Sequence, residues 1–196
     1  MNAPGQPVPL VLELAQIRKQ AEANQAYALT LVEGLSEQQL EWRPEPRRWS
    51  IADNFVHLRL TVQMCLGPLD AAIASARERK LFSNGPFRMT LMGRLFAWYV
   101  EPPPAIRLPA PKTLVPPLQG SASEALPAWI VAHTQIVERI EAANGLDLVR
   151  ASFTSPFASF VRMNLLALFA VFNGHERRHL WQANNVRSAL LSLPQR

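Results

Sequence analysis

Two histidines near the C-terminal end of the chain have a spacing that suits metal binding. His175 and His179 lie four residues apart in the segment NGHERRHLWQA. On a helix, four residues turn the chain by about 400°, so both imidazoles leave the same face one turn apart. Two imidazoles placed in this way can bind one divalent metal ion. The pair therefore indicates a metal site, although such pairs are also common among ordinary surface residues.

The same segment contains the pattern H-E-x-x-H, in which metalloproteases place two zinc ligands and a glutamate general base. Those enzymes take a third ligand from further along the chain. No histidine, aspartate or glutamate follows His179, so we do not expect a metalloprotease. Glu176 lies about 100° from the face of the histidines, and we expect it to form a surface or interhelical salt bridge. A third ligand must come from upstream, where His57 and His133 are the candidates.

The two upstream candidates have different neighbours in the sequence. Asp53 precedes His57 by one helical turn and Thr61 follows it by one turn, so polar side chains share its face. The neighbours of His133 are apolar, namely Ile130, Val131, Ile136 and Val137. This second pattern is typical of a packed or half-exposed histidine, but spacing alone does not choose between the two.

Three polar residues could support the ligands. Gln182 lies seven residues after His175 and Asn164 eleven before it, so both fall near the same helical face. Asp53 could orient the ring of His57 through a hydrogen bond. For each of the three, an ordinary helix cap or surface position is the simpler interpretation.

The aromatic residues and the single cysteine are interpreted as packing residues. Trp42, Trp49 and Trp181 are expected to fill space rather than to form a platform for a substrate. Cys65 is expected to be a small buried hydrophobic residue. With one cysteine the chain can form neither an internal disulfide nor a zinc site built on several thiolates.

Helices must position these residues, and the apolar periodicity predicts four long ones. We expect them over residues 10–34, from Ser50 to beyond Leu66, over 123–143 and over 160–184. A kink is expected at Pro68. With little strand pattern, the chain is predicted to be all-α and to form a four-helix bundle.

Shorter elements are expected between the long helices. Ser36 with Gln39, and Ser50 with Asp53, have the spacing of capping boxes. A short apolar helix is predicted over residues 87–100, and a loop with possible short extended pieces over 146–160.

Proline marks the long connections. Seven of the 17 prolines fall between residues 102 and 117, where they exclude a regular helix. We therefore predict a proline-rich loop over 101–122 that permits a crossover between the second and third long helices. Residues 1–9 are expected to form an extended tail, and residues 1–196 a single domain.

Composition excludes several classes of protein. Of the 196 residues, 48% are hydrophobic and 18% are charged, which is too apolar for a disordered chain. A net charge of +5 raises the question of nucleic acid, but the basic residues are scattered, so no nucleic-acid partner is expected. The longest apolar run near the C-terminus, 165–172, is too short to span a bilayer. We expect no membrane partner and a cytoplasmic location.

Two segments resemble the signatures of a known family. LSEQQLEWRP, continuing into RPEPRRWSIADNFVHL, resembles the second-helix signature of the DinB-like superfamily, and HERRHLWQA resembles its fourth-helix signature. Both occur in the family's order and at about its spacing. The longer stretch 145–183 is also similar to the family. The resemblance extends from about residue 10 to 186 and is weakest over 80–122.

The resemblance implies a four-helix bundle in which three histidines hold a metal ion and leave coordination positions open. His57 matches the histidine of the second-helix signature, and His175 and His179 match the HxxxH pair of the fourth. His133 matches no ligand position and is expected to be structural. Zinc or nickel is the expected ion, since imidazole suits both. The family includes thiol-dependent transferases and isomerases that use low-molecular-weight thiols.

These features together predict a divalent-metal-dependent enzyme acting on a small molecule. A thiol-dependent S-transferase, with a low-molecular-weight thiol as cosubstrate, and a hydrolase are the expected activities. The alternative is a non-catalytic helical module that binds a metal or another ligand. The resemblance also allows a homodimer. A nucleotide cofactor is not expected, because the chain has no glycine-rich phosphate-binding loop.

Overall fold

A computed structural model describes residues 9–104, 111–116 and 122–194 of the chain. Most of the tail predicted over residues 1–9 lies outside this described part, as do residues 105–110 and 117–121 of the predicted proline-rich loop. Within it, the chain is mostly helical with one small two-stranded hairpin, in keeping with the prediction of an all-α protein.

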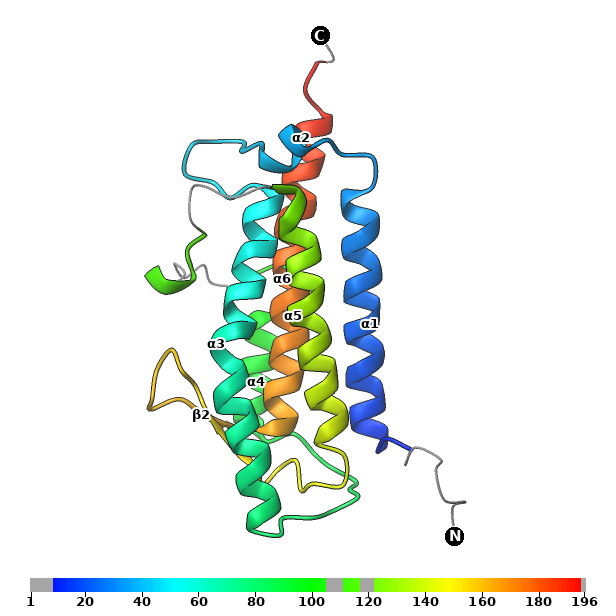
Figure 1. The fold of residues 1–196 in the computed structure, drawn as a ribbon, viewed down its shortest axis with the longest axis vertical. Helices are drawn as coiled ribbons and strands as arrows, with labels where there is room; N and C mark the ends of the chain where they lie inside the picture. Colours follow the sequence, from blue (N-terminus) through cyan, green and yellow to red (C-terminus); the bar gives the residue numbers. More distant parts are fainter. Residues whose placement is uncertain (1–8, 105–110, 117–121, 195–196) are drawn as a thin grey trace.

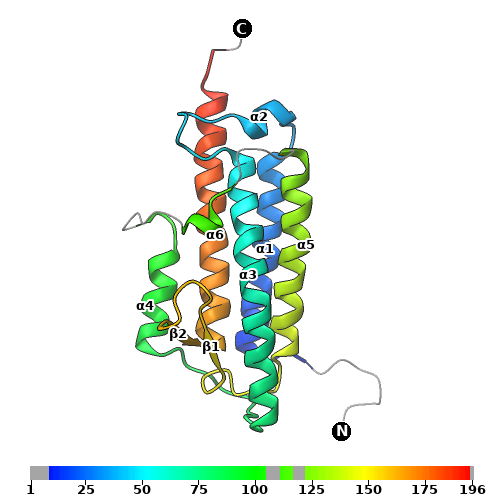
Figure 2. The same cartoon turned by 60° about the vertical axis from the view of Figure 1, so that its left-hand side comes forward.

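Four long helices run side by side along the length of the molecule (Figures 1 and 2). They are α1 (Leu12–Val32), α3 (Ile51–Glu78), α5 (Ala122–Ala142) and α6 (Leu165–Leu191). The shorter elements are α2 (Glu37–Glu41), α4 (Leu91–Val100), the 3-10 helix η1 (Lys112–Leu114) and an antiparallel hairpin of β1 (Ser152–Thr154) and β2 (Arg162–Asn164).

Local capping sets where several helices begin. The predicted capping boxes are both present: Ser36 with Gln39 starts α2, and Ser50 with Asp53 starts α3. Thr90 caps α4 by accepting a hydrogen bond from the Gly93 amide, so this helix begins later than the predicted residue 87.

The boundaries predicted for the last helix are wrong. Residues 162–164 pair with 152–154 as a strand, and Asn164 then caps α6, so the helix begins at Leu165 rather than at 160. It ends at Leu191 rather than at 184. Strand pairing is a contact between distant residues, which the apolar run in the sequence does not reveal.

The second long helix extends beyond Leu66, as predicted. α3 runs through Pro68 to Glu78. The chain directions in Figure 1 show that α3 and α5 both run downward, so the connection between them returns the chain along the molecule. This connection contains α4 and η1.

A layer of buried polar residues divides the core. One apolar cluster is centred on Leu69, Ile140 and Phe169, and the other on Phe55, Trp129 and Leu180. Around the junction of the two clusters lie the buried polar side chains Asn24 of α1, Asn54, His57 and Thr61 of α3, His133 of α5, and Asn173, Glu176 and His179 of α6. All four long helices contribute to this layer, which is the most conspicuous chemical feature of the interior.

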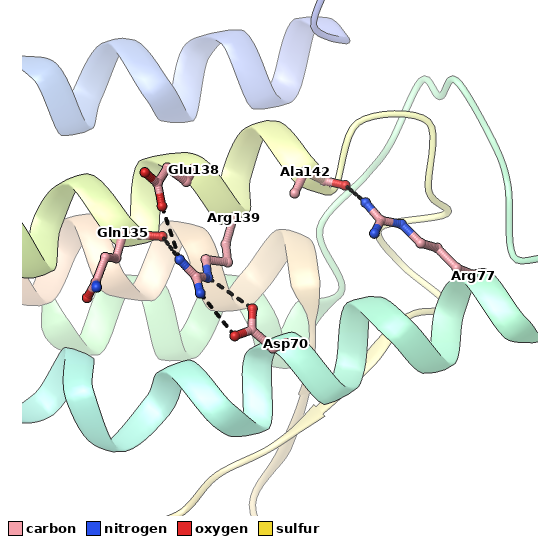
Figure 3. Close-up of polar contacts among 6 residues, drawn as sticks. All are labelled: Asp70, Arg77, Gln135, Glu138, Arg139 and Ala142. Atoms are coloured by element: carbon pink, nitrogen blue, oxygen red, sulfur yellow. Dashed lines mark hydrogen bonds and ion pairs between the residues drawn. The ribbon is translucent and has the colours of Figure 1, made fainter.

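Away from this layer, α3 and α5 are tied by surface contacts (Figure 3). The Arg139 guanidinium donates two hydrogen bonds to Asp70, at 2.9 and 3.0 Å, and holds the pKa of that carboxyl below its usual value. Arg77 donates to the Ala142 carbonyl at 2.8 Å. Within the described residues no helix is both long enough and apolar enough to cross a membrane.

Candidate metal centre

Three histidines from two helices meet in the polar layer. His57 projects from α3, and His175 and His179 project from α6. Each ring offers one nitrogen, and the three donor atoms all lie within 4.8 Å of one another. His57 Nε2 lies 3.4 Å from His175 Nε2. Among the described residues this is the only group of three or more potential ligands that converges in this way.

The ring of His57 is fixed by the connection that follows α4. Its Nδ1 lies 2.8 Å from the Leu114 carbonyl oxygen in η1. A carbonyl can only accept, so Nδ1 carries the proton and donates. The lone pair of His57 is therefore on Nε2, the nitrogen that faces His175. A distant backbone group selects the tautomer that a metal ligand requires.

His179 is fixed in the same way by a neighbour on α3. Its Nδ1 lies 3.0 Å from Asn54 Oδ1. The amide nitrogen of Asn54 donates to the Ser50 carbonyl at 2.8 Å, which orients the amide so that its oxygen faces the ring. Nδ1 of His179 is therefore the donor, and its Nε2 keeps a free lone pair.

Burial keeps the three imidazoles uncharged near neutral pH. It is the main cause that lowers the pKa of His175 to about 3, with repulsion from His57 and Arg178 adding to it. Burial and the same kind of repulsion place the pKa of His179 well below its usual value. The pKa of His57 is lowered by burial, against an opposing effect of the hydrogen bond to Leu114. Neutral imidazoles are the form that binds a metal ion.

Trp49 lies against the cluster. Its ring centroid is 4.8 Å from that of His57 and 5.7 Å from that of His179, on which it stacks. The side chain is half-buried, so it borders the histidines instead of filling the core. Trp42, in contrast, packs against the core cluster around Phe55, as predicted.

Among the described residues, none of the three predicted supporting residues makes a hydrogen bond to a histidine ring. Asp53 accepts hydrogen bonds from the Ser50 amide and from Arg43, with Nε and Nη2 of the guanidinium at 2.9 and 3.0 Å. Asn164 caps α6 by accepting from the Ala167 amide at 2.8 Å. Gln182 is half-buried and makes no hydrogen bond to any described residue. Two of the three are thus helix caps, which is what residues of these types do at helix starts.

The supports that are present were not predicted. Asn54 stands three residues before His57, so a polar residue one turn away on a buried face could have indicated it. Leu114 contributes only its carbonyl, and nothing in the side-chain sequence marks that role.

Glu176 does not lie on the surface. It is buried and pairs with His133 across the helices, Oε1 to Nδ1, at 2.8 Å. Asn24 donates to its other oxygen at 3.0 Å. The interhelical pairing that the sequence suggested is therefore present as a hydrogen bond between the two side chains, and the surface position is excluded. This pair shares the polar layer with the three histidines.

The end of α4 rests on α6 beside the cluster. Arg177 pairs with Glu101, and Arg178 donates to the Tyr99 carbonyl at 3.2 Å. Gly174 permits this approach, since a Cβ there would stand 2.8 Å from Val100 Cγ2. Within the described part of the proline-rich connection, Leu114 thus contacts His57, and Glu101 contacts Arg177, which lies between His175 and His179 in the sequence.

Comparison with known proteins assigns the family. The chain matches the DinB superfamily over residues 20–183, a range that contains His57, His175 and His179. Comparisons with curated proteins and with solved structures give no match. Since the matched range covers most of the 196 residues, this chain belongs to the DinB superfamily.

Proposed function

We propose that the protein is a divalent-metal-dependent enzyme acting on a small molecule, with His57, His175 and His179 as the metal ligands. The observation that carries this proposal is the convergence of three imidazole donors with no carboxylate or thiol of the described residues among them. Three protein ligands with a remaining open position are typical of catalytic sites, whereas structural zinc sites have four.

The residues fit zinc or nickel. Imidazole is a good ligand for both ions, and Leu114 and Asn54 leave the Nε2 atoms of His57 and His179 free to bind. A divalent ion held there would supply Lewis acidity, which lowers the pKa of a bound water or thiol and makes a nucleophile available near neutral pH.

The remaining residues restrict how a substrate approaches. Trp49 covers one side of the rings and the η1 segment around Leu114 another. His57 and His179 are buried, whereas His175 keeps some exposure to solvent, so we infer that the substrate approaches on the side of His175. A thiol-dependent S-transferase and a hydrolase both fit this arrangement, because either needs one activated nucleophile and one side from which the substrate can approach.

A transferase would need a thiol from outside the chain. Cys65 is buried, and burial raises its pKa to about 12, so it holds no thiolate at neutral pH. The thiol in this proposal is therefore a low-molecular-weight cosubstrate. A small-molecule substrate and a cytoplasmic location belong to the same proposal.

Metal content tests the ligand assignment. Protein loaded with zinc or nickel and then desalted should carry one ion per chain, measured by elemental analysis. His57→Ala, His175→Ala and His179→Ala should each lose it while keeping a helical circular dichroism spectrum. His133→Gln is the matched control and should retain the ion, since His133 lies with Glu176 and not in the cluster. Wild-type protein that holds no stoichiometric metal after loading contradicts the proposal.

Activity is a separate test. The loaded protein should consume small thiols in the presence of an electrophile, or hydrolyse ester or amide substrates, and the three alanine variants should not. Stoichiometric metal without turnover in either assay would overturn the enzymatic part and favour the alternative, a non-catalytic metal-binding module.

A further inference from the structure

Helix α4 has two faces of different character. Its inner face packs on α6, with Gly93 against Ala167 and Val100 against Gly174. Its outer face holds four apolar side chains within an arc of about 120°. Their exposed fractions are 73% for Leu91, 56% for Met92, 51% for Leu95 and 61% for Trp98. An apolar helix face turned toward solvent has no role in the core and indicates a binding surface.

The charged side chains that flank these apolar residues are basic, and the nearest acidic residue on the helix, its C-cap Glu101, is paired with Arg177. Between Arg79 and Val100 the sequence holds four basic residues and no acidic one. Arg88 and Arg94 flank the apolar side chains and are exposed, and neither is paired with a carboxylate in the described part of the chain. A surface of this kind is complementary to a partner that is both apolar and anionic.

The neighbouring hairpin has the same character. β1 and β2 lie at the same height as α4 in both views, and Figure 2 shows them next to each other on one side of the molecule. Phe160, in the loop of the hairpin, is 86% exposed. Arg150 and Arg162 are exposed, and residues 148–175 contain no acidic residue. The hairpin thus extends the cationic and apolar surface beyond α4.

We propose that α4 attaches the protein peripherally to an anionic lipid surface, with Leu91, Met92, Leu95 and Trp98 entering the interface and the flanking arginines contacting the headgroups. Amphipathic helices with Trp, Leu and basic residues lie in the plane of a bilayer in this way. The cytoplasmic leaflet carries the required negative charge. This differs from the sequence-based expectation of no membrane partner, because the exposure of the α4 side chains follows from the packing of α4 on α6.

A second copy of the chain fits this surface less well. The four α4 side chains expose roughly 500 Å² in total, short of the ~800 Å² per partner of a standard protein interface. Two copies meeting through α4 would also bring their arginines together without a carboxylate between them, which is unfavourable. A lipid surface requires neither a matching shape nor a large rigid area.

Vesicle co-sedimentation of the full chain tests the proposal. Wild-type protein should sediment with vesicles of equal parts phosphatidylglycerol and phosphatidylcholine, and much less with phosphatidylcholine alone. Leu95→Glu should weaken binding about tenfold or more, because a leucine that enters the lipid interface in the bound state is replaced by a charge. Replacing Arg88 and Arg94 by glutamine should weaken it about fivefold per charge on anionic vesicles only. The emission of Trp98 should shift to shorter wavelength on binding, and this change should be absent in Trp98→Phe.

Val131→Glu is the matched control. Val131 is 63% exposed on α5, which lies on the opposite side of the molecule from α4 in Figure 2, so the same apolar-to-acidic change should leave binding intact. Wild-type protein that stays in the supernatant with anionic vesicles overturns the proposal. So does equal binding to both vesicle types, or a dimer in light scattering that Leu95→Glu dissociates, which would assign the face to a second copy.

Discussion

At the scale of single residues, two of the three candidate ligands are oriented by groups that bind their Nδ1 atoms. Leu114 and Asn54 accept from His57 and His179, and so leave Nε2 as the binding nitrogen. Partners of this kind orient ligands and raise their basicity, and their loss costs about 10- to 100-fold in metal affinity. The site therefore depends on an amide and a carbonyl as well as on the rings themselves.

Asn54→Leu tests this dependence. The variant keeps the three histidines but leaves the His179 Nδ1–H without an acceptor, so zinc affinity should fall about 10- to 100-fold, measured by competition with a chromogenic chelator. Thr61→Val is the control, because the Thr61 hydroxyl lies in the same layer but donates to the His57 carbonyl and not to a ring. Equal affinity in Asn54→Leu and wild type would show that Asn54 does not orient the ligand.

The lowered pKa of His175 predicts how the metal-free protein responds to acid. The unfolded chain takes up a proton at this histidine below pH ~6.5, whereas the folded chain resists it until about pH 3. Protons therefore favour the unfolded state in this window, so stability falls as pH drops from about 6.5 toward 3. Urea unfolding midpoints should decline over this range, and His175→Gln should flatten the decline. An unchanged pH dependence in the variant would contradict the shift.

At the scale of helices, some helix starts depend only on neighbouring residues, and others depend on contacts between distant parts of the chain. The capping boxes at Ser36 and Ser50 were predicted because they depend only on residues three apart. The pair His175 and His179 was recognisable for the same reason. The start of α6 was not predicted, because it depends on pairing between β1 and β2.

The variant Asn164→Ala tests whether Asn164 only caps α6 or also supports the metal ligands. Since Asn164 accepts from the Ala167 amide at the start of α6, its loss should destabilise the protein by about 1 kcal/mol in urea unfolding. Zinc affinity should stay within about twofold of wild type, because α6 presents His175 and His179 several turns later. A larger loss of affinity without a loss of stability would restore the original prediction that Asn164 supports the ligands.

The contact of α4 with α6 depends on Gly174, where any side chain would collide with Val100. In Gly174→Ala, the new Cβ would meet Val100 Cγ2 at 2.8 Å, a strain of about 1–3 kcal/mol that outweighs the gain of about 1 kcal/mol from replacing a helical glycine. The variant should be less stable in urea. Gly67→Ala in α3 is the control, because nothing outside its immediate neighbours lies within 4 Å of its Cβ, and it should be neutral or stabilising. A stabilised Gly174→Ala would mean that α4 is not held at this position.

At the scale of the whole molecule, the polar layer could be predicted in part. The sequence shows which histidines share a face of a helix, and the resemblance connects His57 to the pair on α6. It does not show that Glu176 points inward toward His133, because the angular position of a residue on its helix does not say which neighbour that face meets. Nor does it reveal Leu114, whose carbonyl reaches His57 across 57 residues of chain.

The buried pair Glu176–His133 allows the stability of this layer to be measured. Glu176→Leu leaves His133 buried with no partner for either ring nitrogen, since its Nε2 already has none among the described residues. Breaking a buried pair from one side costs about 3–5 kcal/mol. Replacing both residues by leucine removes the unpaired group as well, and such apolar replacements are often neutral. The double variant should therefore be more stable in urea than Glu176→Leu alone. The single variant His133→Leu completes the comparison. If the losses of stability in Glu176→Leu and His133→Leu add up to the loss in the double variant, the two side chains are not coupled. The layer is then held by the hydrogen bonds of Asn24 and Asn173 instead.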